Sequence, residues 1–224
     1  MTARLALVIL AVSAALGSAM VAPARAQSAA SPSASANDIA KGIEAFYSGV
    51  KSFKAAFKHV YAQGSPKTKD ASGIVFVEKP GKASWRYANN GNRIVSDGTR
   101  VRAYQQREKQ MYDAPVAESS FSAALAFVGG SGNLRQAFKL TRPPSAQHNF
   151  TGFILLAEPR QPTPAYAKMA LYIDPATYQV RRVLMVDAQG NKNRIDFTQV
   201  ELNVAPPPGE FVFTPPKGTL IIQR

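Results

Sequence analysis

Apolar and polar residues alternate with a period of two over most of this chain. In residues 53–61, apolar side chains fall on one side and Lys54 and Lys58 on the other, as in a strand with one buried face. Similar short segments follow at residues 73–78, 83–87, 93–96, 101–105, 152–157, 167–173, 180–186, 194–200 and 210–213. Hairpin-forming turns such as Asp97-Gly98 separate several of them, so the pattern predicts one large antiparallel sheet.

Two segments have helical periodicity instead. Apolar residues recur at helical spacing from Ile39 to Val50, and Asn37 and Asp38 are candidate N-caps, so we expect a helix over 38–51. A second helical region is expected over 118–138, interrupted at Gly129-Gly130. These helices are too few to cover both faces of the sheet. We therefore expect the sheet to curl, with the helices inside it or over its mouth.

The N-terminus has the features of a cleaved export signal. Arg4 precedes an apolar run from Leu5 to Leu16, and Ala24-Arg25-Ala26 offers a cleavage site before Gln27. The alternative, a membrane anchor, is disfavoured because the run is shorter than the roughly 20 residues that span a bilayer. We predict a signal peptide at 1–26, a disordered leader at 27–36 and one domain at 37–224.

The amino-acid composition limits the reactions and partners that the chain can have. The chain has no cysteine, which excludes disulfides, thiol catalysis and lipidation of the chain itself. Without Arg4 and Arg25 it keeps 25 basic residues against 14 acidic ones, a net charge of +11. The basic residues are scattered and the chain is exported, so we expect no nucleic acid partner. Attraction to anionic lipid or an acidic partner, and plain solubility, both remain explanations of the charge.

No catalytic or metal-binding motif stands out. His59 and His148 lack ligand spacing, and we interpret His59 as a packed or surface residue. Ser131 lies in a Gly-Gly-Ser-Gly sequence that is neither a nucleophile elbow nor a phosphate loop. Acidic residues occur singly, mostly in turns. We expect a binding protein rather than an enzyme, with no metal and no cofactor.

Three segments carry distinctive motifs. Residues 73–87, with Lys79-Pro80 followed by Trp85, have the pattern G-x-φ-x-φ-x-[KR]-P-x-x-x-x-W, and residues 94–98, Tyr104 and Gln110 follow. This stretch resembles the corresponding part of the periplasmic lipoprotein carrier family LolA. Residues 211–218 are similar to its F-x-F-x-P-P-x-G ending, and residues 46–53 to its opening helix and strand. Together these segments span most of the chain after the predicted signal peptide.

The resemblance implies an unclosed antiparallel β-barrel, or half-barrel, of about ten or eleven strands with an α-helical lid, in agreement with the alternation of apolar residues. It also implies a monomeric periplasmic chaperone that binds the acyl chains of triacylated lipoproteins. The cargo would come from an inner-membrane lipoprotein-releasing ABC transporter. It would pass to an outer-membrane lipoprotein acceptor or directly to the outer membrane.

The resemblance assigns site residues as well. An apolar cavity for acyl chains is expected to be lined by Phe46, Phe57, Phe76, Trp85, Tyr87, Tyr104 and Leu155. The lid is expected to contain Phe121, Ala124, Leu125 and Phe127. Lys79 occupies a basic position that is commonly Arg in the family and is expected to latch the lid. Ala83 stands where a well-known member has an aromatic residue.

Other functions compete with the carrier hypothesis. A related half-barrel serves as a periplasmic regulatory protein that senses lipids or peptides, although it has a second domain for which this chain is short. All the site residues can also be read as ordinary core or turn residues. Alternation alone does not decide which of Val75, Phe76 and Val77 faces inward.

Overall fold

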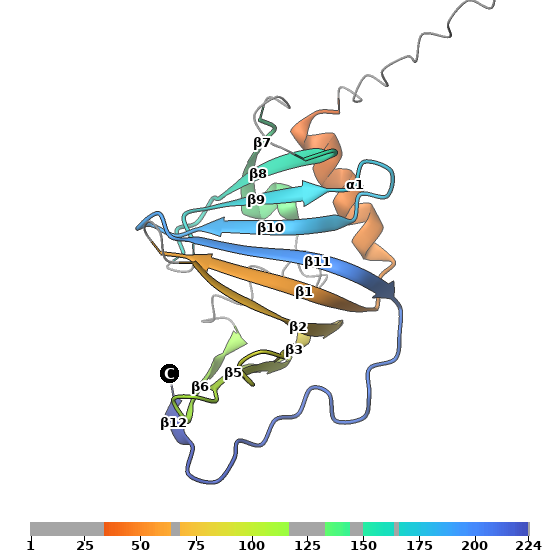
Figure 1. The fold of residues 1–224 in the computed structure, drawn as a ribbon. Helices are drawn as coiled ribbons and strands as arrows, with labels where there is room; N and C mark the ends of the chain where they lie inside the picture. The colour runs from red at the N-terminus through yellow and green to blue at the C-terminus, as the bar shows by residue number, and fades with distance from the viewer. Residues whose placement is uncertain (1–33, 64–67, 117–132, 144–149, 164–165, 224) are drawn as a thin grey trace, which may run out of the picture. The chain divides into compact units, whose positions relative to one another are not determined.

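A single sheet of twelve strands organises the part of the chain that the computed structural model describes, residues 34–63, 68–116, 133–143, 150–163 and 166–223 (Figure 1). These residues belong to one unit, Ser33–Arg224. The strands of its first half are β1 (Ser52–Ala62), β2 (Thr68–Glu78), β3 (Lys82–Tyr87), β4 (Arg93–Asp97), β5 (Arg100–Gln105) and β6 (Gln110–Pro115). Those of the second half are β7 (Phe138–Thr141), β8 (Phe153–Pro159), β9 (Lys168–Ile173), β10 (Val180–Val186), β11 (Lys192–Leu202) and β12 (Leu220–Gln223).

The sheet is open and almost wholly antiparallel. Its strand order is β12-β6-β5-β4-β3-β2-β1-β11-β10-β9-β8-β7, so β12 and β7 form its two edges. Only β12 pairs in parallel, with β6, among the described strands. The predicted fold class, an open antiparallel sheet with few helices, is confirmed. The expected ten or eleven strands become twelve.

The turn signals located most strands correctly, with one wrong strand and three missed ones. Strands β6, β7 and β12 were not predicted, and β2 begins at Thr68 rather than residue 73. The predicted strand at 210–213 is a turn and an irregular segment. Pro206, Pro207 and Pro208 precede it, and Gly209 has φ +76°, so the backbone cannot extend a ladder there.

Helix α1 (Ala36–Ser48) begins two residues before its predicted start. Its N-cap is Ser35, whose side chain accepts from the Asp38 amide while the Asp38 carboxylate accepts from Ser35. Asp38 is therefore the third residue of a capping box and not the N-cap. Ser35 and Ala36 belong to the folded part and not to the predicted leader. Helix α3 (Leu134–Ala137) is a single turn before β7.

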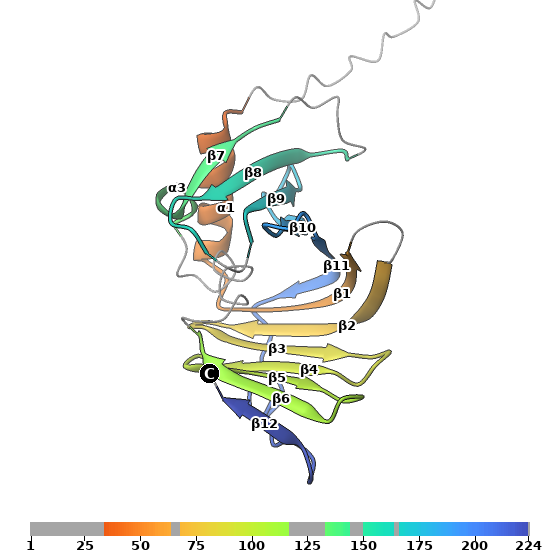
Figure 2. The same ribbon diagram turned by 90° about the vertical axis from the view of Figure 1, so that its left-hand side faces the viewer.

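One face of the sheet packs against α1, and we call it the helix face. Ile39, Ile43 and Tyr47 repeat at four-residue spacing on α1 and are buried. They join a core with alternate residues of the strands, among them Val75 and Trp85. Figures 1 and 2 show α1 beside β7 and β8, with which it is in contact.

The opposite face, which we call the outer face, is covered over β3 to β5 by the C-terminal segment, residues 203–219. The ring of Phe213 lies 5.4 Å from that of Tyr104 on β5. The buried Glu210 carboxylate accepts from Ser84 Oγ at 2.7 Å. It also pairs with Arg86, on the same face of β3. Figure 1 shows this segment running from the end of β11 to β12 at the far edge of the sheet.

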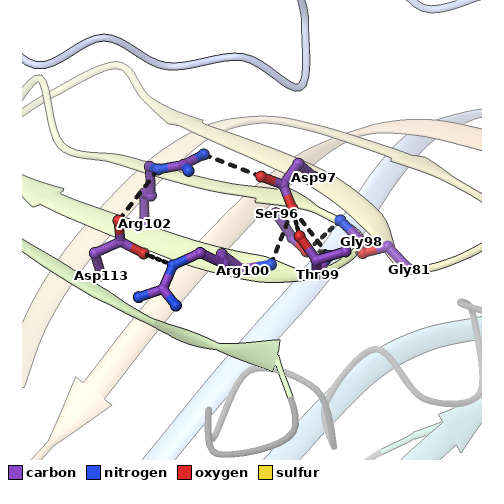
Figure 3. Close-up of polar contacts among 8 residues, drawn as sticks. All are labelled: Gly81, Ser96, Asp97, Gly98, Thr99, Arg100, Arg102 and Asp113. Atoms are coloured by element: carbon purple, nitrogen blue, oxygen red, sulfur yellow. Dashed lines mark hydrogen bonds and ion pairs between the residues drawn. The ribbon is translucent and has the colours of Figure 1, made fainter. Parts of the chain in front are cut away.

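The turn between β4 and β5 is held by the Asp97 carboxylate (Figure 3). Its Oδ1 accepts from the Thr99 and Arg100 amides, each at 2.9 Å, and its Oδ2 from Arg102 at 3.1 Å. Burial alone would raise the pKa of Asp97, but these donors together hold it well below its ordinary value. Arg100 and Arg102 both reach Asp113 on β6, so this turn is tied to the next strand.

Candidate functional site

Aromatic side chains form the centre of the helix face. The ring of Trp85 lies 4.8 Å from that of Phe57 and 6.1 Å from that of Phe197, which come from three different strands. Trp85 is 1% exposed and packs between β2 and β4, opposite Val75 and Ile94. These rings belong to the same apolar core as the buried side chains of α1, although the strands that α1 contacts most are β7 and β8.

Few described polar contacts hold α1 to the rest of the fold. The Lys79 ammonium donates to the carbonyl of Tyr47 at 2.5 Å, near the end of the helix. The Val180 amide donates to the Tyr47 hydroxyl at 3.2 Å, and burial raises the pKa of that hydroxyl. Arg135 of α3 pairs with Glu44 at 2.8 Å. A cation at the C-terminal end of a helix also interacts favourably with its dipole.

The described partner of the Lys79 ammonium is therefore α1. The predicted lid residues Phe121, Ala124, Leu125 and Phe127 lie outside the described residues, so a contact of Lys79 with them stays a prediction. Partial burial lowers the pKa of Lys79.

Replacing Lys79 with Met should loosen the last turn of α1. The Tyr47 carbonyl keeps the Val50 amide but loses its side-chain donor, worth roughly 1 kcal/mol, so amide hydrogen exchange at residues 44–48 should speed up by about threefold to tenfold. Mass spectrometry of deuterated peptides measures this. Lys82→Met is the matched control, because Lys82 lies just beyond the same turn but pairs with Glu78. Equal exchange in both variants would contradict the contact.

The structure divides the seven predicted cavity residues between the two faces. Phe57, Trp85 and Leu155 are buried in the helix-face core, and Phe46 and Tyr87 pack against it partly buried. Phe76 and Tyr104 fall on the outer face by strand alternation, and Tyr104 packs on Phe213 of the C-terminal segment. The first five therefore share the helix-face core, and Tyr104 meets Tyr87 only in the lining of a cleft at one end of strands β1 to β5. Ala83 is also on the helix face, 3% exposed.

A cleft of about 210 Å³, which we call the polar cleft, lies at one end of strands β1 to β5. Its lining includes His59, Tyr87, Ile94, Lys69, Asn90 and Gln105. His59 Nε2 lies 2.6 Å from Asn193 Oδ1, and His59 Nδ1 lies 3.0 Å from the Tyr87 hydroxyl. The imidazole is part-buried, in agreement with one of our two interpretations, but its bridging of β11 and β3 was not foreseen. Its alignment with Phe57 at a spacing of two was the available signal.

The buried imidazole should make stability depend on pH. Burial lowers the pKa of His59 below 6.5, although the bond to Asn193 opposes the shift. Below pH 6.5 the unfolded chain then binds a proton more readily than the folded one, so stability falls as pH falls, by at most about 1.4 kcal/mol per pH unit. Urea unfolding at pH 7.5 and 5.5 should show a smaller loss for His59→Gln than for the wild type. An equal loss would contradict this assignment.

Among the described residues, no group of three or more His, Asp or Glu side chains is close enough to hold a metal ion. No described helix is long and apolar enough to cross a membrane.

A family model and the curated relatives point to one family. A family model described as outer membrane lipoprotein carrier protein LolA matches residues 48–214. The chain is 27% identical over 210 residues to an outer-membrane lipoprotein carrier protein of Chromobacterium violaceum, covering 93% of this chain and 94% of that one. A carrier protein of the same description from Bordetella avium is 28% identical over 187 residues, covering 81% and 85%.

A solved structure supports the fold alone. The crystal structure of a conserved protein from Thermus thermophilus superposes with a TM-score of 0.52 at 13% sequence identity. The match covers 84% of this chain and 99% of that one.

Proposed function

The chain belongs to the LolA family of outer membrane lipoprotein carrier proteins, and from this membership we propose that it carries acylated lipoproteins through the periplasm. The predicted signal peptide, residues 1–26, would direct it there. In this proposal the chain works as a monomer and as a binding protein, with no catalytic step.

The observation that supports the proposal best is the helix-face core. Phe57, Trp85 and Leu155 belong to one apolar core on an open sheet, and α1, which contacts β7 and β8 at one end of that sheet, is held by few described polar contacts. The polar cleft, at about 210 Å³, is smaller than the 300–1,000 Å³ of ordinary ligand pockets. An acyl chain would therefore take the place of α1 side chains such as Ile43 on this face. We expect α1 to move when cargo binds.

The energetics explain why such a carrier is needed. Each buried CH₂ contributes about 0.8 kcal/mol, so an acyl chain of roughly 16 carbons resists transfer to water by about 10 kcal/mol, and three by about 30. Unassisted crossing of an aqueous compartment is negligible at that cost. A carrier must offer an equivalent apolar surface and still release the cargo, which a closed and an open state of nearly equal free energy would allow.

The partners in this proposal are those that the family resemblance implies. An inner-membrane lipoprotein-releasing ABC transporter would load the chain with triacylated lipoprotein. An outer-membrane acceptor, or the outer membrane itself, would receive the cargo. The surplus of basic residues would favour approach to an anionic leaflet.

Native mass spectrometry tests the proposal. The protein is mixed with proteoliposomes that contain the transporter and a triacylated lipoprotein, and we expect a one-to-one complex. The matched control is the same lipoprotein with its acylated cysteine replaced by serine, which should give no complex. Absence of the complex with the acylated cargo would overturn the proposal. Equal binding of the unacylated form would instead favour the peptide-sensing regulator.

A further inference from the structure

The polar cleft continues a row of aromatic rings that begins in the helix-face core. Trp85 and Phe57 have ring centres 4.8 Å apart, and Phe57 and Tyr87 have centres 5.0 Å apart. His59 is next, 5.9 Å from Tyr87, and lines the cleft with it. Along this row the surface changes from wholly apolar to hydrogen-bonding. A ligand with an apolar tail and a polar head could follow the same change.

Hydrogen bonds fix the inner wall of the cleft. Asn193 Oδ1 can only accept, so the imidazole nitrogen 2.6 Å away, His59 Nε2, carries the hydrogen. His59 Nδ1 then accepts from the Tyr87 hydroxyl at 3.0 Å. The Tyr87 oxygen keeps its lone pairs as acceptors. The Tyr87 ring is held in place by Phe57 on one side and by His59 on the other. This side of the cleft is therefore preorganised rather than adaptable.

The rest of the lining is rich in donors. Lys69 is exposed, and no described residue forms an ion pair with its ammonium. Within the same part of the structure, the Gln105 side-chain amide makes no hydrogen bond. Asn90 Oδ1 accepts from the Asn92 amide, which leaves the Asn90 NH₂ group as a donor. The lining contains no Asp or Glu.

This set of groups selects a class of ligand. A cationic head would find no carboxylate, and an apolar one would leave the donors unsatisfied. Ester and amide carbonyls fit, because they accept from Lys69 and Gln105, and an amide N–H can donate to the Tyr87 oxygen. Several such carbonyls join the acyl chains of an acylated protein to its first residue.

We infer that the polar cleft binds the ester- and amide-bearing head of the acylated cargo while its acyl chains lie along Phe57 and Trp85. The inference rests on the proposed carrier function. It divides the site into an apolar part that gives affinity for acyl chains and a polar part that distinguishes a head with ester and amide carbonyls from a plain long-chain alcohol.

Two probes test the polar part and the apolar part of the site separately. One is a synthetic tripalmitoyl-cysteinyl peptide with an uncharged tail, and the other is 1-hexadecanol, which has an acyl-like chain and no carbonyl. Binding is followed by the fluorescence of Trp85, the single tryptophan of the chain. The variants are Lys69→Met and Gln105→Leu, singly and together. The matched control is Lys168→Met, which removes an exposed charge outside the cleft.

The double variant should bind the lipopeptide about tenfold more weakly and hexadecanol within twofold of the wild type. Each single variant should show part of the loss, and Lys168→Met none. An unchanged lipopeptide affinity, or an equal loss for both probes, would overturn the inference and leave the carrier function intact. A wild-type protein that binds neither probe would overturn both.

Discussion

Replacing Trp85 with Ala should lower the free energy of unfolding by about 3–5 kcal/mol, the largest effect we expect of any single change. The side chain is 1% exposed and contacts Phe57 and Phe197, so its removal leaves a cavity between three strands. Urea unfolding followed by circular dichroism measures the change, because the variant has no tryptophan to report by fluorescence.

Tyr112→Ala is the matched control for this prediction. Tyr112 lies on the same face, in register with Ala103 and through it with Ile94, but is only partly buried. Its removal should cost less than about 2 kcal/mol. If both variants lost the same stability, Trp85 would not be the centre of this core.

Replacing Glu210 with Ala should lower the free energy of unfolding by about 3 kcal/mol and release the C-terminal segment. The carboxylate is fully buried and accepts from Ser84 and Arg86, while Arg93 donates to the Glu210 carbonyl at 3.1 Å. Its loss leaves Arg93, whose side chain is 20% exposed, and the more exposed Arg86 without this counter-charge, and it leaves the buried Ser84 hydroxyl without its acceptor. Urea unfolding measures the stability, and limited proteolysis should cut within residues 203–219 faster than in the wild type.

Glu201→Ala controls for the loss of one acidic residue. Glu201 also forms an ion pair, with Lys54 at 2.6 Å, but the Glu201 side chain is 51% exposed. Exposed pairs contribute about 0–1 kcal/mol, so this variant should unfold nearly like the wild type. A Glu210→Ala protein that resists proteolysis as well as this control does would refute the anchoring role of Glu210.

Local chemistry made much of the fold predictable. Asp97-Gly98 was predicted as a hairpin turn, and the structure shows why: the Asp97 side chain accepts from the next amides while Gly98 takes φ +98°. These interactions involve residues at most three apart, so a sequence pattern can show them. Strand β12 depends instead on its pairing with β6, more than a hundred residues away, and no local sequence signal near Leu220 predicts it.

The candidate site was less predictable, because alternation marks two faces without saying which one is covered. Phe76 resembles Val75 and Val77 in character, yet α1 packs only on the face that holds the two valines. Glu210 in an apolar segment suggested a strand, whereas its partners Ser84 and Arg86 lie on a strand formed much earlier in the chain. Both outcomes follow from tertiary contacts that local sequence does not encode.

The position of β1 in the sheet has a consequence for folding kinetics. β1 pairs on one side with β2, its neighbour along the chain, but on the other with β11, so that Lys54 meets Glu201, 147 positions later. Closing such a loop costs much more chain entropy than closing a hairpin, and topologies rich in distant contacts fold slowly. The two halves of the sheet can form their local hairpins early. The hydrogen bonds between β1 and β11 can form only after residues up to about 202 have been synthesised.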